Sequence, residues 1–487
     1  MPMDEITTVT RVAAARPSGE LQKRTANAAC SGEACISRAA KIIADAARDY
    51  RCVAVVSAMS GVTNQLIEAA NQARAGKAVE ATRVLEALRK QHESALVALI
   101  PQEERRKICQ KVEDVLAEGR RLCEGTALLR ELTPRTLDAV SSLGERLSAP
   151  LVAAAVKAAG ASCEAIEASE LIVTDAFHGG AEPQMELTRE KSQARMCPLL
   201  EKGIVPVVTG FIGATADGQL TTLGRGGSDF SATLLGAALD ADEVIIWTDV
   251  DGVLTADPRL VPEARTIPVI SYREAAELAY FGAKVLHPKT LNPVVQAAIP
   301  VWIRNSFAPE KPGTKITPEG RSIGGGVKAL TAIRDVTLIS VGGPGIVGLP
   351  DVVGRTFSTT AEVRANVLLI SQSSSQNDIC FIVASADAQR TVDALRKEFA
   401  RDLAHHDVEH ITVNPNIAIV AVVGENMRGI PGIAGKTFSA LGRDGVNLIA
   451  IAQGSSESNI SFVIEGGAVK TALLTTHREF GLDKSQN

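Results

Sequence analysis

The chain has few aromatic residues and little net charge. Its 487 residues include 11 Phe, 3 Tyr and 2 Trp, and the formal net charge at pH 7 is −5. Base-stacking platforms need aromatic side chains, and phosphate backbones need an excess of positive charge. The sequence therefore argues against a nucleic-acid partner, and we expect small metabolites as ligands.

The chain also lacks metal and disulfide motifs and any long apolar run. Its eight cysteines are scattered without a CxxC pair or a nearby histidine cluster, so we expect reduced, mostly buried thiols and no bound structural metal. No segment approaches the roughly 20 apolar residues of a membrane helix, and the N-terminus carries charges where a signal peptide needs an apolar run. We expect a cytoplasmic protein with no membrane partner.

Length and a hydrophobic content of 45% predict a globular protein of roughly three domains. From Ile36 onward, amphipathic helices alternate with the apolar runs CVAVVS, IVPVVTG (204–210) and EVIIWTD (243–249), which predicts a largely parallel sheet. Residues 65–160 are mostly helical by period, with breaks at Pro101 and Pro134. The inward-facing candidates in this helical layer are Leu85, Leu88, Leu96, Leu99, Val112 and Val115.

The C-terminal part of the chain repeats itself after a boundary rich in Gly, Pro and Lys at 311–330. GRTFS at 354–358 returns as GKTFS at 435–439, 81 residues later and without a gap. Each copy predicts the order strand, helix, strand, loop, strand, helix. This βαββαβ pattern resembles the ACT domain, a small amino-acid-binding regulatory module.

A glycine-rich loop, TLGRGGSDFS at 222–231, follows an apolar approach. Its glycines let backbone N–H groups come close to a ligand, and Arg225 can hold a carboxylate or phosphate in two-pronged fashion. Ser228 or Asp229 can open the following helix, which we expect over 231–239. The loop predicts an anion site, with a purely structural turn as the alternative.

Other polar residues allow both a functional and a structural reading. Ser57 and Thr63 in SAMSGVTN either line a pocket or cap the next helix. Glu145 in SSLGER either binds a ligand or interacts with a helix dipole.

The same ambiguity holds further along the chain. TDVDG at 248–252 can hold a nucleotide or form a hairpin turn. Arg259, in the loop TADPR, can likewise contact a nucleotide or belong to a structural turn. Lys284 in FGAKVLHP either binds a phosphate or lies on a solvated helix face, and we expect a structural role for His287.

Together, SAMSGVTN, SSLGER, VVTGFIG, TLGRGGSD, TDVDGVLTADPR and FGAKVLHP, followed by the tandem repeats, closely resemble the aspartokinases of the amino acid kinase superfamily. The resemblance implies an α/β fold with a largely parallel sheet sandwiched by helices, followed by two α+β, ferredoxin-like ACT domains. The implied bounds are 36–325 for the kinase domain and 331–408 and 409–487 for the ACT domains, after an atypical segment 1–35. The implied activity is ATP-dependent phosphorylation of L-aspartate to 4-phospho-L-aspartate, with Mg²⁺, at the entry to lysine, threonine and methionine synthesis.

The resemblance also implies a role for each site residue. Arg225 would bind the α-carboxylate of aspartate, while Asp229 and Glu145 would face its ammonium group. The other residues implied around aspartate and the γ-phosphate are Ser57, Thr63, Gly226, Gly227 and Ser228, and those around ATP are Thr248, Asp249, Arg259 and Lys284. A carboxylate is already a nucleophile near neutral pH, so the enzyme mainly aligns two anions and needs no general base.

One family motif is missing. RTANAAC at 24–30 stands where aspartokinases have KFGGTSV, so the phosphate-facing lysine, the glycine pair and the preceding apolar strand are all absent from the sequence pattern. Loss of one such charge commonly lowers turnover about 10²-fold or more. Either a shifted reading frame has scrambled the N-terminus, which we favour, or the chain is an impaired homologue that acts as an amino-acid-binding regulator.

The loops ISQSSSQNDICF and IAQGSSESNISF resemble the regulatory half of bifunctional aspartokinase–homoserine dehydrogenases, which predicts threonine as the effector and lysine as the second choice. The chain ends at Asn487, so we expect no dehydrogenase domain. The candidate effector ligands are Asn366, Gln372, Asn447 and Gln453, whose amides could instead satisfy turn backbones. We expect a homodimer or homotetramer formed through the ACT domains.

Overall fold

The structure, a computed structural model, describes most of the chain in two units. The described residues are 32–282, 286–320, 326–343, 350–372, 378–425, 427, 430–452 and 458–484, and the backbone of 9–12 and 23–26. The first unit comprises Met1–Val253, Thr266–Tyr272 and Val285–Gly320, and the second comprises Leu254–Arg265, Arg273–Lys284 and Arg321–Asn487.

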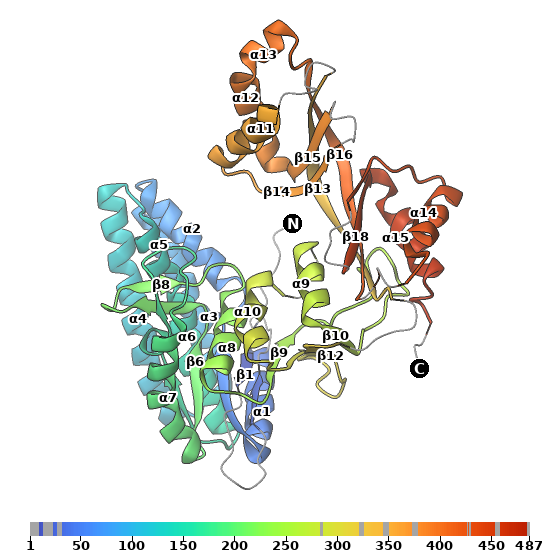
Figure 1. Cartoon of the computed structure of the whole chain (residues 1–487). Coiled ribbons are helices and arrows are strands. Elements are labelled where there is room, and N and C mark those ends of the chain that lie inside the picture. The colour runs from blue at the N-terminus through green and yellow to red at the C-terminus, as the bar shows by residue number, and fades with distance from the viewer. Residues whose placement is uncertain are drawn as a thin grey trace. The chain divides into compact units, whose positions relative to one another are not determined.

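A nine-stranded sheet organises the first unit (Figure 1). In spatial order its strands are β10 (Val269–Ser271), β12 (Thr314–Thr317), β11 (Val301–Asn305), β9 (Val244–Thr248), β1 (Val9–Val12), β2 (Lys23–Ala26), β3 (Arg51–Val56), β6 (Val205–Thr209) and β4 (Cys163–Ile166). Strands β11, β9, β2, β3, β6 and β4 all run parallel. β6 and β9 are buried along their whole length, as parallel strands covered on both faces must be. The predicted, largely parallel sheet is confirmed.

The N-terminal strand that the sequence pattern lacks is present. β2 lies parallel to β3, with Lys23 opposite Arg51 and Ala26 opposite Ala54, and Ala26 also pairs with Ile245 of β9. Backbone N–H and C=O groups form this ladder whatever the side chains are, so a polar stretch can occupy the position. The expectation that the family's first strand is missing is therefore wrong, although β2 overlaps the stretch RTANAAC and does not precede it. Residues 27–31, which hold most of the expected phosphate-binding segment, lie outside the described residues.

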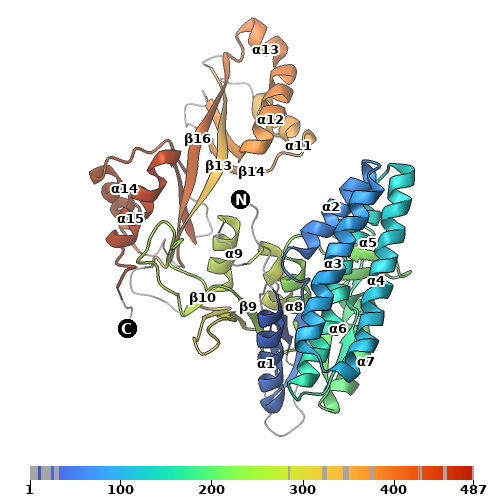
Figure 2. The same ribbon diagram turned by 180° about the vertical axis from the view of Figure 1, so that it is seen from behind.

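Helices cover both faces of this sheet. Their bounds are α1 (Glu33–Asp49), α2 (Val62–Arg74), α3 (Ala78–Leu99), α4 (Gln102–Leu129), α5 (Pro134–Ser141), α6 (Leu143–Ala158), α7 (Met185–Glu201), α8 (Gly227–Ala238) and α10 (Asn292–Gln296). The first four and α6 share one hydrophobic core with the sheet, and Figure 2 shows α2, α3 and α4 as an upright layer. All the inward candidates of this layer are buried except Leu99, which is half-buried. Pro101 precedes α4 and Pro134 is the first residue of α5, so both predicted breaks are confirmed.

A small second sheet leads into the glycine-rich loop. β7 (Ile212–Thr215) pairs in parallel with β5 (Val173–Thr174) and antiparallel with β8 (Leu220–Thr222). Because β8 ends at Thr222, the position of this strand sets where the loop begins.

The second unit contains the two repeats in one six-stranded antiparallel sheet, with the order β14-β15-β13-β16-β18-β17. The first repeat consists of β13 (Ala329–Gly342), α11 (Pro350–Glu362), β14 (Val367–Gln372), β15 (Asp378–Ala384), α12 (Ser385–Glu398) and α13 (Ala400–His405). The second consists of β16 (His410–Val423), α14 (Ile433–Arg443), β17 (Ala450–Ala452), β18 (Asn459–Glu465) and α15 (Val469–Glu479). The predicted order of elements is confirmed, although the first strand begins earlier than the pattern suggests.

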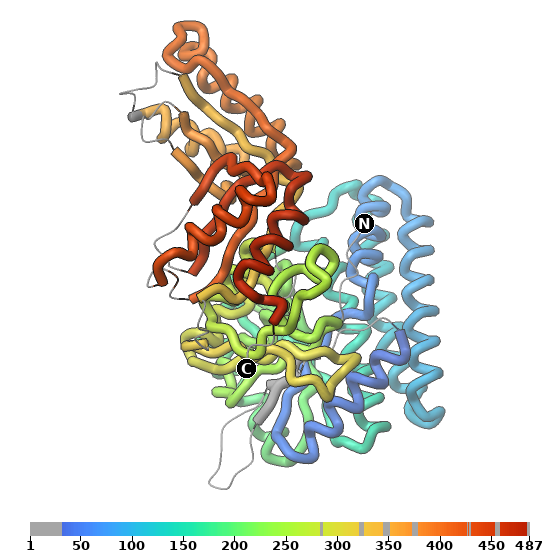
Figure 3. The backbone as a smooth tube through the Cα atoms, turned by 90° about the vertical axis from the view of Figure 1, so that its right-hand side faces the viewer, coloured from blue at the N-terminus to red at the C-terminus, as the bar shows by residue number. Residues whose placement is uncertain are grey.

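The long strands β13 and β16 join the repeats. Ala329 pairs with Val423 and Gly342 with His410, so the two equivalent strands run antiparallel along their whole length, with irregularities between Ile333 and Leu338. The first half of β13 contributes Leu330 to the core of the second repeat, while its second half contributes Ile339 to the core of the first. Figure 3 shows the helices of the two repeats, in orange and red, as separate groups. The shared strands make the repeats one structural unit.

The same aromatic pair stabilises both cores. Phe357 packs edge-on against Phe381 with 5.6 Å between ring centroids, and Phe438 packs against Phe462 at 5.8 Å. Each member of the second pair follows its counterpart by 81 residues, and the rings of Phe381 and Phe462 are fully buried. The internal repeat in the sequence is thus a repeat of core packing.

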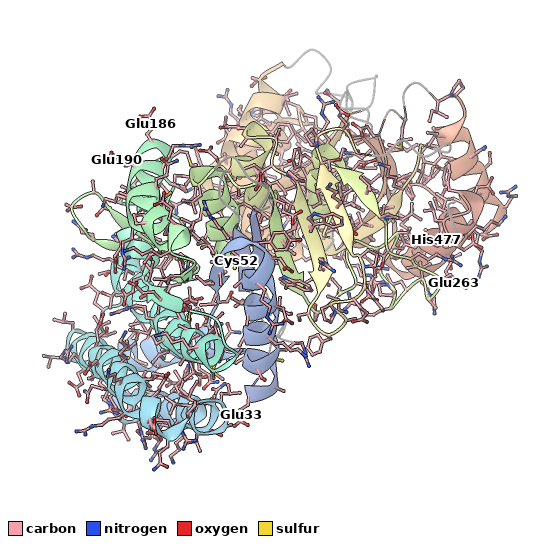
Figure 4. All side chains as sticks on the ribbon, turned by 90° about the horizontal axis from the view of Figure 1, so that it is seen from below. Glu33, Cys52, Glu186, Glu190, Glu263 and His477 are labelled. Carbon is pink, nitrogen blue, oxygen red and sulfur yellow. The ribbon has the colours of Figure 1, made fainter. Side chains whose placement is uncertain are left out.

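A segment from earlier in the chain completes the core of the second repeat. Ala256 and Val261 belong to that hydrophobic cluster. The Leu330 N–H donates to the Thr255 carbonyl at 2.8 Å, and the Thr255 hydroxyl lies 2.9 Å from Nε2 of His477. Burial lowers the pKa of His477, which Figure 4 labels beside Glu263. Leu254–Arg265 therefore belongs by its contacts to the second unit.

Most of the described cysteines are free thiols. Cys52, Cys109, Cys123, Cys163, Cys197 and Cys380 are free thiols, and burial raises the pKa of Cys123 and Cys163 to about 11. Cys35 is disulfide-bonded, so the expectation of a reduced thiol is wrong at this position.

Among the helices in the described part of the chain, none combines the length and apolar character that a membrane crossing requires.

The equivalence of the two cores is testable by matched truncations. We expect Phe381→Ala and Phe462→Ala each to lower the free energy of unfolding by about 3–5 kcal/mol, because both rings are fully buried. Denaturant unfolding measures this loss. Phe177, whose side chain is exposed, is the control, and its replacement by Ala should cost less than about 0.5 kcal/mol. A large cost at only one of the two buried positions would contradict equivalent packing.

Candidate active site

The glycine-rich loop turns directly from β8 into α8. Gly224 and Gly226 have φ of 77° and 71°, the left-handed region that glycine adopts without strain. Gly226 is the N-cap of α8, and its carbonyl accepts from the Phe230 N–H at 3.0 Å. The helix begins at Gly227, so the expected start at Ser231, opened by Ser228 or Asp229, is wrong. Asp229 lies in the first turn.

The glycines of the loop are packed against other segments. A Cβ on Gly226 would lie 2.8 Å from Cβ of His287, and one on Gly227 would lie 2.6 Å from the ring of Phe211. The Phe211 N–H donates to the hydroxyl of Ser231 at 2.9 Å. These contacts hold the loop rigidly, which supports part of the structural alternative. They also leave Arg225 exposed at its tip.

His287 has the structural role that we expected. Its ring caps a short 3₁₀ helix by accepting from the Lys289 N–H at 3.4 Å. Burial, and then the positive charges of Lys289 and Arg225, lower its pKa. His287 is therefore neutral near pH 7 and adds no charge beside Arg225.

Glu145 lies at the carboxyl end of β3. Its side chain is buried in the first turn of α6, and its Oε1 accepts from the Ala58 N–H at 3.2 Å. The preceding Gly144 permits this approach, since a Cβ there would lie 2.7 Å from Cβ of Ala58. The Ser148 hydroxyl donates to the Ser57 carbonyl at 2.7 Å. The motifs SAMSGVTN and SSLGER thus meet directly.

Thr63 does not cap the helix that follows SAMSGVTN. The N-cap of α2 is Gly61 in the left-handed conformation, and it makes no side-chain cap. Thr63 lies one position inside the first turn and is half-buried. The capping alternative is therefore wrong for this residue.

Backbone contacts connect the Glu145 region with the glycine-rich loop. The Gly210 N–H donates to the Val56 carbonyl at 2.7 Å, and a Cβ on Gly210 would lie 2.7 Å from Cβ of Ser228. Because β3 and β6 run parallel, their carboxyl ends share one edge of the sheet. That edge collects Ser57, Glu145 and the start of α8 within one unit.

Thr248 and Asp249 lie at the same edge, where β9 ends. β9 pairs in parallel with β11, so TDVDG is not a hairpin turn between neighbouring strands. Asp249 is exposed, and its Oδ1 accepts from the Thr248 hydroxyl at 3.3 Å. Asp251 instead accepts from Lys311 and Asn305 at 2.6 Å each, and these bonds lower its pKa.

Two expected ATP ligands are not brought to this edge by the described contacts. Arg259 belongs to the second unit, where its exposed guanidinium donates to the Asp257 carboxylate at 2.9 and 2.6 Å. Lys284 lies outside the described residues.

The candidate effector residues lie on the edge strands of the repeats. Asn366 precedes β14 and Gln372 ends it, so the two exposed amides are separated by the length of that strand, about 20 Å. One small amino acid cannot contact both within one repeat. Asn447 is exposed before β17, while Gln453 lies outside the described residues.

Sequence reasoning missed the residues that hold the loop, namely Asp138, His178, Gly179 and Phe211. Nothing in the sequence pattern singles out Asp138, which lies on α5, a different helix from the one that carries Glu145.

Comparison with known proteins accounts for both units. The sequence profile of the amino acid kinase family matches residues 23–305, more than half of the chain. The chain belongs to the amino acid kinase family. The ACT domain profile matches twice in this family member, at 339–399 and 420–480.

Relatives of this amino acid kinase include bifunctional enzymes. The chain is 34% identical over 441 residues to bifunctional aspartokinase/homoserine dehydrogenase 1 of Arabidopsis thaliana, which covers 89% of the chain and 48% of the relative. The chain thus spans about half the length of that relative.

Solved structures of E. coli aspartokinase III resemble the chain over nearly its full length. The complex with aspartate and ADP matches at 29% identity and a TM-score of 0.76, covering 92% of this chain and 97% of that one. The complex with lysine and aspartate matches at 29% identity and a TM-score of 0.75, covering 93% and 97%.

The close packing of the loop gives a stability prediction. Gly226→Ala should lower the free energy of unfolding by about 1–3 kcal/mol, because the residue has φ of 71° and its new methyl would meet His287. Gly125→Ala is the matched control. Gly125 lies within α4 with open space around it, so alanine should raise stability by about 0.5–1 kcal/mol there. Equal effects of the two substitutions, measured by denaturant unfolding, would contradict the assigned role.

Proposed function

We propose that this amino acid kinase phosphorylates the side-chain carboxylate of L-aspartate with ATP. The observation that carries the proposal is the shared edge of the sheet, where Arg225 and Asp229 at the start of α8 lie with the buried Glu145. A cation beside two carboxylates suits an α-amino acid, which has one carboxylate and one ammonium group to be held. The bound aspartate and ADP of E. coli aspartokinase III support this choice.

In this mechanism Arg225 holds the α-carboxylate, and Asp229 and Glu145 hold the ammonium group. Ser57 and Thr63 line the same pocket. The backbone of Gly226, Gly227 and Ser228 would face the reacting carboxylate and the γ-phosphate, because the N-terminal end of α8 favours negative charge. The Gly227 N–H itself donates to the Gly224 carbonyl at 3.0 Å. The side-chain carboxylate attacks directly, so these residues orient and neutralise rather than transfer protons.

ATP would be held by Thr248 and Asp249 at the end of β9, with Mg²⁺ on its phosphates. Arg259 and Lys284 remain ATP ligands only by the family resemblance. The described side chains form no group of three or more His, Cys, Asp or Glu residues suited to a metal ion. Mg²⁺ commonly binds through substrate phosphates, water and one or two carboxylates. The exposed carboxylate of Asp249 fits such a supporting role.

An impaired, amino-acid-sensing homologue is the second candidate. The lysine and glycine pair of KFGGTS are missing from RTANAAC, although its first residues belong to β2, which pairs with β3. We propose that a shifted reading frame explains the sequence of residues 1–35. Resequencing the start of the gene tests this explanation, and an undisturbed reading frame would contradict it.

The proposed activity is tested by formation of aspartyl hydroxamate with purified protein, ATP and Mg²⁺. We expect Arg225→Ala to lower kcat/KM for aspartate about 10²-fold or more, since the α-carboxylate loses its cation. The control is Arg83→Ala, which removes an exposed arginine on α3 and should leave kcat/KM unchanged. A wild-type protein without turnover would favour the sensor, and full activity of Arg225→Ala would refute the assigned role.

We propose an amino-acid effector that acts through the ACT pair, with threonine favoured and lysine next. The loops after β14 and β17 support threonine, while the lysine complex of E. coli aspartokinase III supports lysine. Asn366, Gln372, Asn447 and Gln453 remain candidate ligands, and the bounds 36–325, 331–408 and 409–487 remain our domain proposal. Self-association through the ACT domains is also a prediction.

The effector is identified by titrating threonine and lysine separately against aspartate phosphorylation. We expect inhibition by threonine at concentrations at which lysine has little effect. The D-enantiomer of threonine serves as the control, because a specific site distinguishes the two hands. Indifference to L-threonine with inhibition by L-lysine would overturn the first choice.

A further inference from the structure

Asp138 is a buried carboxylate on α5. Among the described contacts, its side chain bonds to none of the charged residues assigned above to aspartate or ATP. Its side chain is only 3% exposed. Oδ1 accepts from the Thr222 hydroxyl at 2.6 Å, both oxygens accept from the Gly179 N–H at 3.1 Å, and Oδ2 accepts from Nδ1 of His178 at 2.8 Å. A buried carboxylate with this many donors holds its neighbours in one arrangement.

The donors belong to β8, which leads into the glycine-rich loop, and to residues 178–179, which pack against that loop. Thr222 is the last residue of β8 and the first of the glycine-rich loop. The Ala181 N–H donates to the Thr222 carbonyl at 2.9 Å, and a Cβ on Gly224 would lie 3.1 Å from the Gly179 carbonyl oxygen. Asp138 therefore fixes the base from which Arg225 projects.

The backbone of Asp138 fixes a second part of the site. Its carbonyl accepts from the Ser142 N–H at 3.0 Å and from the Ser141 hydroxyl at 3.2 Å, at the join between α5 and α6. Glu145 follows in the first turn of α6. One residue thus contacts both the element that carries Glu145 and the strand that leads to Arg225.

We propose that Asp138 is a positioning residue, which sets the distance between Arg225 with Asp229 on one side and Glu145 on the other. The proposal rests on the proposed function, because it concerns how the amino-acid substrate is gripped. Misplacement by about 1 Å can cost an enzyme about 10²-fold in rate, so a fixed spacing between these groups has a direct effect on the use of aspartate.

Thr222→Val tests this positioning without creating a buried unpaired charge, because Asp138 keeps its bonds to Gly179 and His178. We expect KM for aspartate to rise about tenfold, below the upper figure for a 1 Å displacement, while KM for ATP stays within about twofold of the wild-type value. Thr222→Ser retains the hydroxyl and should restore KM for aspartate.

Thr221→Val is the matched control from the same strand. Thr221 points to the opposite face of β8, is fully buried and bonds to the Thr174 hydroxyl at 2.7 Å. We expect it to lower the melting temperature as Thr222→Val does and to leave KM for aspartate unchanged. An equal rise of KM in both variants, or none in Thr222→Val, would overturn the positioning role.

Calorimetric titration of aspartate in the presence of a non-hydrolysable ATP analogue separates the two proposals. A wild-type protein that binds aspartate without turnover would refute the proposed activity. The Thr222 and Thr221 variants would then be compared by their Kd for aspartate. Binding weakened by Thr222→Val and restored by Thr222→Ser would support the positioning role. A wild-type protein that does not bind aspartate would overturn both proposals.

Discussion

The arrangement of the site depends on one steric constraint, which is that no Cβ fits at Gly226 or Gly227. The Cβ positions of these residues are taken by His287 and Phe211. Because the backbone of the loop lies against those side chains, α8 begins at Gly227 and Arg225 stays outside the packed layer. The same glycines allow close approach to a ligand only on the side that the packing leaves open. The same loop geometry therefore explains both the tight packing of the two glycines and the exposure of Arg225, which could bind an anion.

Apolar runs made the sheet and its helical layer predictable, because a parallel strand covered on both faces must be apolar throughout. β6 and β9 satisfy this rule, whereas β2 does not, and backbone pairing with β3 and β9 places it nonetheless. The start of α8 could not be predicted, since glycine has poor helix propensity and the helix begins there through contacts with Phe211 and Ser231. Arg225 and Glu145 were found as motif residues. Asp138 was missed because an aspartate on an amphipathic helix usually faces solvent.

Contacts between residues far apart in the sequence explain the remaining features that the sequence did not predict. The repeat of 81 residues predicted two equivalent modules, and the paired positions of Phe381 and Phe462 confirm equivalent cores. Nothing in the repeat signals that Ala256 and Val261 complete the second core, because they come from an earlier and unrelated part of the chain. The Thr255 contacts with Leu330 and His477 add polar anchors to that apolar packing. The segment that carries Arg259 thus takes its position from contacts within the second unit.

A reaction between two anions demands alignment more than acid–base chemistry, and this demand explains where the structure places its polar groups. Arg225 and Asp249 are exposed, where they can reach a ligand, while Asp138 and Glu145 are buried and hydrogen-bonded to backbone N–H groups. Desolvating a carboxylate is unfavourable unless donors surround it, so a buried carboxylate is retained where it fixes a geometry. At Asp138 the donors come from β8 and from residues 178–179, and at Glu145 from the end of β3. Asp138 therefore holds together, from within, the elements whose ends would hold the substrate, while Glu145 both joins α6 to the segment after β3 and is a proposed ligand of the substrate.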